Sequence, residues 1–178
     1  LNGATLTADR HGQANRSCSF DGVDDRVDIT VSNALGLNLD VTISVWVKPA
    51  DFNHQDYPFI FSASQGGAAR ALALAGRGPI YGADKGKAQF YVNSDSPSQV
   101  LSGILPLDEW TFIAAVYDGT QYKIYQNGAL MGNDTSVAGG AVSALNTLTI
   151  GCSLHGPVAQ QPWKGDIDDV RVYNRALS

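Results

Sequence analysis

The chain has 178 residues, 44% of them hydrophobic, and a formal net charge of −5. This length is enough to bury the core of one domain, and no run of about 18 apolar residues occurs, so we expect no membrane insertion. The Lys and Arg residues form no cluster, which argues against nucleic acid as a partner. Because the chain begins at Leu1 and not at Met, we expect residues 1–178 to be a single domain excised from a larger protein.

The first part of the chain predicts short strands joined by turns. After a polar segment, Leu1–Arg16, two strands at Ser17–Phe20 and Arg26–Ile29 flank a turn rich in Asp and Gly. Residues Val41–Lys48 alternate between apolar and polar side chains, as in a strand with one buried face, and Pro49 ends that strand. The side chains expected to face the core are Val41, Ile43, Val45 and Val47.

The middle of the chain continues this pattern. Residues Trp110–Tyr117 are apolar on both faces, which indicates either a central strand covered on both sides or one that faces a lined groove. Asp118-Gly119 and Asn127-Gly128 predict two tight hairpins. The other strands are expected at Pro58–Ser64, Arg70–Ala75, Lys87–Asn93, Tyr122–Gln126, Ala129–Gly132 and Leu148–Cys152.

The last strand is expected at Asp166–Tyr173. Regular alternation places Asp168 on one face with Val170 and Val172. A carboxylate on an apolar face needs a hydrogen bond, a counter-ion or a metal. We therefore predict that this strand lies beside the N-terminal strands and that their carboxylates cluster.

Several segments resemble the laminin-G-like modules of the concanavalin-A-like lectin/glucanase superfamily. They are SFDGVDDRVDI, TISVWVKP, EWTFIAAVYDGTQYKIYQNGALMG, LTIG and GDIDDVRVYNRALS, in this order. The resemblance, with the many short strands, implies an all-β fold: a two-sheet antiparallel β-sandwich, the concanavalin-A-like jelly roll.

The resemblance also implies a structural calcium ion. Calcium prefers six to eight oxygen ligands from carboxylates and turn carbonyls. Carried over to this chain, Asp21 and Asp168 would be the side-chain ligands. The alternative stays open that the Asp residues of these segments are solvated and that Asp168 caps backbone N–H groups.

Enzyme chemistry has little support in the sequence. Glycoside hydrolysis needs two carboxylates about 5 to 10 Å apart across the scissile bond, and the resembling hydrolases carry them on one strand. This chain has a single Glu, Glu109, at the entrance of a strand. The sequence therefore predicts a protein that is not an enzyme.

Cys18 and Cys152 both share a face with apolar residues of their strands. Two inward cysteines in an extracellular module are compatible with a disulfide. They are equally compatible with two separate buried thiols.

A ligand is expected in three long loops, Ala50–Tyr57, Gly76–Gly86 and Leu154–Pro162, which supply aromatic and planar cationic groups. An outward face with Tyr91, Asn93 and Tyr125 is the alternative, and Trp46 and Trp110 are assigned to the core. The candidate ligand-binding residues are Tyr57, Arg77, Tyr81, His155 and Trp163.

These features predict a non-catalytic, extracellular recognition module that binds a glycan or another cell-surface ligand. We expect it to be monomeric as a module and to adjoin further domains of its parent protein. The alternative function is a protein–protein adhesion module or a structural spacer of a large secreted or surface protein, because a fold by itself does not fix function.

Overall fold

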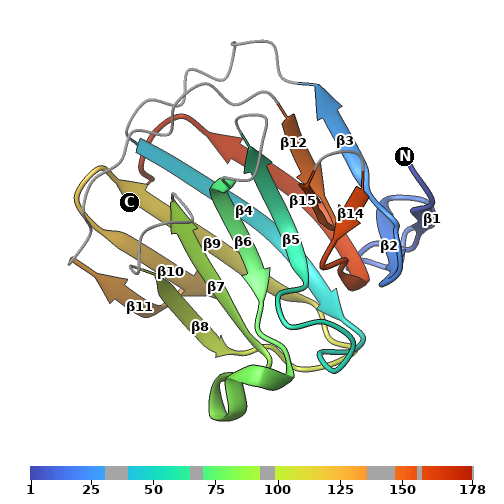
Figure 1. The fold of residues 1–178 in the computed structure, drawn as a ribbon, viewed down its shortest axis with the longest axis horizontal. Helices are drawn as coiled ribbons and strands as arrows, with labels where there is room; N and C mark the ends of the chain where they lie inside the picture. The colour runs from blue at the N-terminus through green and yellow to red at the C-terminus, as the bar shows by residue number, and fades with distance from the viewer. Residues whose placement is uncertain (31–39, 65–69, 93–98, 136–146, 156–157, 178) are drawn as a thin grey trace.

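The computed structural model describes residues 1–30, 40–64, 70–92, 99–135, 147–155 and 158–177. Two antiparallel sheets pack face to face as a β-sandwich (Figure 1). This confirms the predicted jelly-roll fold. In the described part of the chain, no helix is both long and apolar enough to cross a membrane.

The larger sheet contains seven strands. It joins the two ends of the chain, because β2 (Ser17–Asp21) and β15 (Lys164–Tyr173) lie side by side with Phe20 opposite Gly165. The prediction that the last strand lies beside an N-terminal strand is therefore confirmed. In spatial order the strands are β1 (Thr5–Thr7), β2 (Ser17–Asp21), β15 (Lys164–Tyr173), β4 (Asp40–Pro49), β9 (Thr111–Asp118), β10 (Tyr122–Gln126) and β11 (Ala129–Asp134).

The smaller sheet contains six strands and lies in front of the larger one in Figure 1. A separate two-stranded ribbon consists of β13 (Ser153–His155) and β14 (Val158–Gln160). In spatial order the six strands are β3 (Val27–Thr30), β12 (Thr147–Ile150), β5 (Phe59–Ser64), β6 (Arg70–Gly76), β7 (Lys87–Val92) and β8 (Val100–Ile104).

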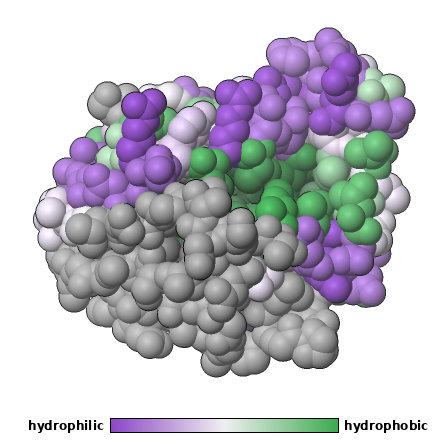
Figure 2. Space-filling model, turned by 90° about the horizontal axis from the view of Figure 1, so that it is seen from above, coloured by the Kyte–Doolittle hydropathy of each residue, from purple (hydrophilic) through white to green (hydrophobic). Residues whose placement is uncertain are grey.

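The core lies between the two sheets and follows the predicted alternation. The four inward residues of β4 are completely buried, and on the facing sheet Ala88, Phe90 and Val92 of β7 are at most 2% exposed. Tyr122 packs edge-on against Phe90, with ring centroids 5.6 Å apart. Seen from above, apolar residues gather on the surface from the centre of the view to its right side, with hydrophilic residues above them and at the lower right (Figure 2).

Two of the tryptophans lie where the other kind of environment was expected. Trp163, predicted in a ligand loop, is 1% exposed and packs edge-on against Phe52 in the core, 5.9 Å between centroids. Trp46, predicted in the core, is half-buried on the outer face of the larger sheet, because the inward positions of β4 are taken by its valines and Ile43. Trp110 is half-buried just before β9 and is not part of the core cluster of the described residues.

Candidate functional site

A groove crosses the outer face of the seven-stranded sheet because small residues lie between large ones. In the sheet, Arg171 of β15 lies opposite Ser44 of β4, Ser44 opposite Ala114 of β9, and Ala114 opposite Tyr125 of β10. Strands are about 4.8 Å apart, so a serine and an alanine form a low floor between an arginine and a tyrosine about 14 Å apart.

One end of the groove is aromatic. Trp46 and Phe112 are paired across β4 and β9, and their ring centroids lie 5.4 Å apart at 46°. At the other end, Tyr173 lies opposite Thr42. The volume of the groove is about 550 Å³, within the range of small-molecule sites. The lining residues are Arg10, Thr42, Ser44, Trp46, Phe112, Ala114, Val116, Tyr125, Gly128, Asp169, Arg171, Tyr173 and Leu177.

The apolar outward side chains of β9 are thereby explained. Phe112, Ala114 and Val116 line the groove, while Ile113 and Ala115 are buried in the core. Of the two interpretations of this doubly apolar strand, the lined groove is the one that the structure bears out.

A β-bulge in β15 brings charged residues to the groove. The pairing with β4 shifts between Asp168 and Arg171, and Asp169 has a left-handed backbone with φ of 48°. One extra residue exchanges the two faces of the strand beyond it. The expectation that Asp168 shares a face with Val170 and Val172 is therefore wrong: the two valines pack against the core, whereas Asp168 lies opposite the outward Trp46. Beyond the bulge, Asp169, Arg171 and Tyr173 line the groove.

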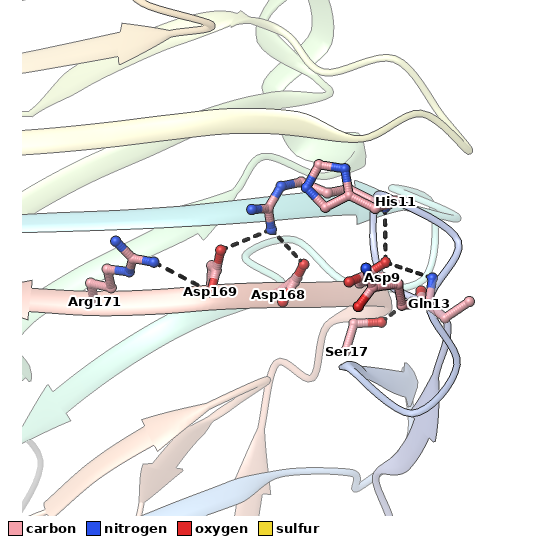
Figure 3. Close-up of polar contacts among 9 residues, drawn as sticks. Asp9, His11, Gln13, Ser17, Asp168, Asp169 and Arg171 are labelled. Carbon is pink, nitrogen blue, oxygen red and sulfur yellow. Dashed lines mark hydrogen bonds and ion pairs between the residues drawn. The ribbon is translucent and has the colours of Figure 1, made fainter.

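The partner that Asp168 requires is Arg10. One guanidinium nitrogen of Arg10 lies 2.8 Å from a carboxylate oxygen of Asp168 and 2.8 Å from one of Asp169. Asp169 is also 3.6 Å from Arg171, and Figure 3 shows Asp168, Asp169 and Arg171 in sequence along β15. The prediction that this carboxylate needs a partner is correct, and Arg10 is a partner of it.

The loop between β1 and β2 holds Arg10 in this position. The carboxylate of Asp9 accepts hydrogen bonds from the backbone N–H groups of His11 and Gln13, both at 2.8 Å (Figure 3). The Ser17 hydroxyl donates to the Ala8 carbonyl at 2.8 Å. Burial raises the pKa of Asp9, but the backbone hydrogen bonds and nearby positive charges outweigh it and lower the pKa overall. The carboxylate therefore stays ionised and keeps the turn closed.

The acidic turn after β2 forms a separate cluster. Oxygen atoms of Asp21, Asp24 and Asp25 lie within 4.8 Å of one another. Asp25 is 7% exposed and accepts a hydrogen bond from the Asp21 backbone N–H at 2.8 Å. Burial, and then the charges of Asp21 and Asp24, raise the pKa of the Asp25 carboxyl.

The predicted metal pair, Asp21 and Asp168, is not brought together. Asp21 lies opposite Lys164 in the β2–β15 ladder, and Asp168 is four residues further along β15. At about 3.3 Å per residue, the two side chains start about 13 Å apart. This is too far for one ion, because calcium–oxygen distances are about 2.4 Å.

Three of the predicted ligand residues do meet, outside the smaller sheet. The Tyr57 and Tyr81 rings lie edge to face at 5.2 Å, and the guanidinium carbon of Arg77 lies 4.3 Å from the Tyr81 ring centroid. Burial, and then a hydrogen bond with Tyr57, raise the pKa of Tyr81. Tyr81 belongs to the short 3₁₀ helix η1 (Pro79–Asp84), at the lower edge of Figure 1.

The guanidinium group of this cluster forms its hydrogen bonds with other residues of the protein. Arg77 is only 5% exposed, and its guanidinium donates to Gln89 at 3.0 Å and to Asp84 at 3.1 Å. Its contacts therefore attach η1 to the sheet. The predicted loops are in contact: the Gly78 N–H donates to the Asp56 carbonyl at 2.9 Å, and the Tyr57 N–H to the Gln161 side chain at 3.1 Å.

The remaining predicted positions are distributed as follows. His155 is in β13, with its side chain outside the described part of the structure, and Asn93 is outside it altogether. Tyr91 and Tyr125 do not share a face, because they belong to different sheets. Cys18 and Cys152 are both free, so the structure contains two separate thiols. Burial raises the pKa of the Cys152 thiol to about 12.

Of the residues that line the groove, the sequence suggested only Tyr125 as a ligand contact, whereas Trp46 was assigned to the core. The alternation in β4 predicts that Thr42, Ser44 and Trp46 face outward. The small residues Ser44 and Ala114, at the centre of two strands, could have indicated the floor of the groove. Arg10 and Asp169 were not accessible in this way, because their positions depend on a long-range contact and a bulge.

The groove and the fold can be compared with known proteins. A family model described as Concanavalin A-like lectin/glucanases superfamily, of the laminin G type, matches residues 21–178. The chain belongs to this superfamily. No curated protein sequence gives a significant match.

Solved structures of low sequence identity share the fold. Domain 4 of AbnA, an extracellular GH43 arabinanase from Geobacillus stearothermophilus, in complex with arabinotriose, has a TM-score of 0.70 at 21% identity, covering 100% of this chain and 78% of that one. The CBM40 of the Ruminococcus gnavus IT-sialidase, bound to α2,3 sialyllactose, has 0.69 at 15%, covering 91% and 93%. A SAP-like pentraxin from Limulus polyphemus has 0.65 at 22%, covering 90% and 76%.

Proposed function

We propose that this protein is a non-catalytic, extracellular carbohydrate-binding module, and that the sugar binds in the groove on the seven-stranded sheet. The observation that carries the proposal is the pairing of Trp46 and Phe112 beside a low floor flanked by hydrogen-bonding side chains. Aromatic side chains with a few directed polar groups suit a ligand with apolar faces and many hydroxyls. The sugar complexes of two structural neighbours support this choice.

The carboxylates near the groove favour binding over hydrolysis. A hydrolase needs a carboxyl group that holds a proton and a second, ionised one across the bond. Asp168 and Asp169 are adjacent in sequence, and both are paired with Arg10. Glu109 is exposed and does not line the groove. We therefore expect no release of reducing sugar from common β-glucans or galactans.

A structural calcium ion is part of the proposal. The donors would be Asp21, Asp24 and Asp25, whose carboxylates converge and repel one another. The donor set fits the ion in charge and in atom type. Bound there, calcium would supply positive charge that allows Asp25 to stay ionised and would fix the turn between β2 and β3.

A glycan array with four proteins tests the sugar site. We expect the unmodified protein to bind a defined group of glycans, and Trp46→Ala and Ala114→Phe to lose that binding while their melting temperatures stay close to that of the unmodified protein. The first variant removes a stacking surface and the second fills the floor. Thr5→Phe, which adds the same side chain on exposed β1, is the matched control and keeps binding.

Two other outcomes separate the alternatives. A blank array with folded protein would favour the adhesion or spacer function. Sugar binding that survives both groove changes but is lost in Tyr57→Ala or Tyr81→Ala would move the site to the loops over the smaller sheet.

A further inference from the structure

Three charged groups of the groove form an open series with Asp168, which lies beside the groove. Along it, Asp168 pairs with Arg10 at 2.8 Å, Arg10 with Asp169 at 2.8 Å, and Asp169 with Arg171 at 3.6 Å. Two carboxylates and two guanidinium groups alternate, so their charges sum to zero. Figure 3 shows the carboxylates of this series and Arg171 on the same side of β15.

This series gives an acidic sugar little to bind. Arg10 already contacts two carboxylates, and a third would lie close to both. The side chain of Arg171 is 61% exposed, so an ion pair made with it is screened by water and contributes little. The chain as a whole carries a charge of −5, which opposes the approach of an anion.

The same groups suit a neutral sugar. A hydroxyl group both donates and accepts hydrogen bonds, and Asp169 and Arg171 present an acceptor and a donor side by side. Hydrogen bonds to ionised partners are the stronger ones. The apolar face of the sugar ring would then lie towards Trp46 and Phe112, at the neighbouring end of the groove.

We propose that the groove selects neutral oligosaccharides over acidic ones, with Asp169 and Arg171 binding two adjacent hydroxyl groups of one sugar unit. This inference rests on the proposed function, because it assigns a ligand class to the same site. It makes Asp169 and Arg171 the specificity-determining residues.

Calorimetric titration with matched sugars tests the ligand class. The probes are arabinotriose, lactose against α2,3 sialyllactose, and galactan against polygalacturonate. We expect at least one neutral probe to bind, and its acidic counterpart to bind at least about tenfold more weakly. The affinity for the neutral probe should change less than about twofold between low and high salt, because salt does not screen an uncharged ligand. Tighter binding of the acidic probe that weakens with salt overturns the inference but leaves the proposed function standing. A panel without any binding overturns both.

Substitutions of Asp169 and Arg171 provide a second test. Whether Asp169→Asn weakens or strengthens binding depends on whether the ligand is neutral or acidic. For a neutral sugar, Asp169→Asn and Arg171→Gln each weaken binding, by about tenfold, because each removes a charged hydrogen-bond partner. For an acidic sugar, Asp169→Asn strengthens binding, since it removes a like charge. Arg16→Gln, an exposed arginine outside the groove, is the matched control, and circular dichroism confirms that each variant is folded.

Discussion

The guanidinium carbon of Arg10 lies 5.1 Å from the centroid of the Trp46 ring. These two residues come from the N-terminal loop and from the centre of the larger sheet, and neither is buried in the core. The contact joins the loop to the aromatic end of the groove, and the ion pairs with β15 fix its position. A cation over an indole contributes about 0.5–1 kcal/mol where it is exposed and more where it is desolvated.

Removing this arginine should destabilise the fold. The side chain of Asp168 is 7% exposed, so Arg10→Ala leaves a buried carboxylate without its counter-ion. We expect the free energy of unfolding to fall by about 2–4 kcal/mol, measured by urea denaturation. Adding Asp168→Asn to this variant should recover part of the loss, and Arg16→Ala should have almost no effect. Equal losses in Arg10→Ala and Arg16→Ala would contradict this role for Arg10.

The two tryptophans should respond in opposite ways to substitution. Trp163→Ala leaves a cavity beside Phe52 and should cost about 3–5 kcal/mol of unfolding free energy, whereas Trp46→Ala should cost less than about 1.5 kcal/mol, because its side chain is partly solvated. Only Trp46→Ala should weaken sugar binding without a comparable loss of stability. Chemical denaturation and glycan titration on the same samples measure both effects.

The contribution of Asp118 to the stability of the fold should depend on pH. Burial raises the pKa of Asp118, but hydrogen bonds from Thr120 and Gln121 outweigh it and lower the pKa to about 2. A lowered pKa stabilises the fold above the unfolded value, near 4, and this contribution disappears as pH falls through about 2. Asp118→Ala should therefore lower stability by about 1–2 kcal/mol at pH 6 and by much less at pH 2. A difference that is constant over this range would show that the carboxylate charge is not involved.

Calcium should raise the melting temperature through the acidic turn. At a hundredfold excess over the Kd, an ion that binds only the folded state adds about 2.7 kcal/mol. Without calcium, the raised pKa of Asp25 favours the fold below the unfolded pKa, and this contribution is lost as pH rises through the folded value. The calcium effect should thus grow from pH 4 to pH 7. The rise in melting temperature with calcium should disappear in Asp25→Asn but persist in Asp168→Asn. A melting temperature that EDTA does not change, together with no metal in elemental analysis, would refute the calcium proposal.

The cysteines should behave as two separate thiols. Cys152 is completely buried and its pKa is about 12, so it should not react with iodoacetamide at pH 8 in the folded protein. Cys18 is half-buried and should react slowly. After denaturation without reductant, mass spectrometry should find both alkylated. A protein that remains unalkylated after denaturation would contain the disulfide instead.

The fold was predictable because its signals are local. Strand periodicity in β4, β7 and β9 and the turn pairs at Asp118 and Asn127 need only neighbouring residues, and the resemblance supplied the arrangement of the strands. The sequence also indicated that Asp168 needs a partner.

The groove was less predictable because it depends on positions across strands. Ser44 and Ala114 form a floor only once β4 and β9 are in register. Arg10 reaches Asp168 over 158 residues of sequence. The aromatic residues of the long loops led to the prediction of a ligand site there. In the structure, Tyr57, Tyr81 and Arg77 contact one another.

The bulge at Asp169 divides β15 into two halves that are out of phase by one residue. Without the extra residue, the pairing with β4 would be regular and Arg171 and Tyr173 would keep their outward face. With the extra residue but no bulge, regular alternation would turn Arg171 and Tyr173 towards the interior, in exchange for Val170 and Val172. Sequence alignments of this superfamily therefore need a one-residue gap wherever a relative lacks the bulge. Without that gap, the residues compared with Arg171 and Tyr173 would be core residues, and differences in ligand preference would be attributed to the wrong positions.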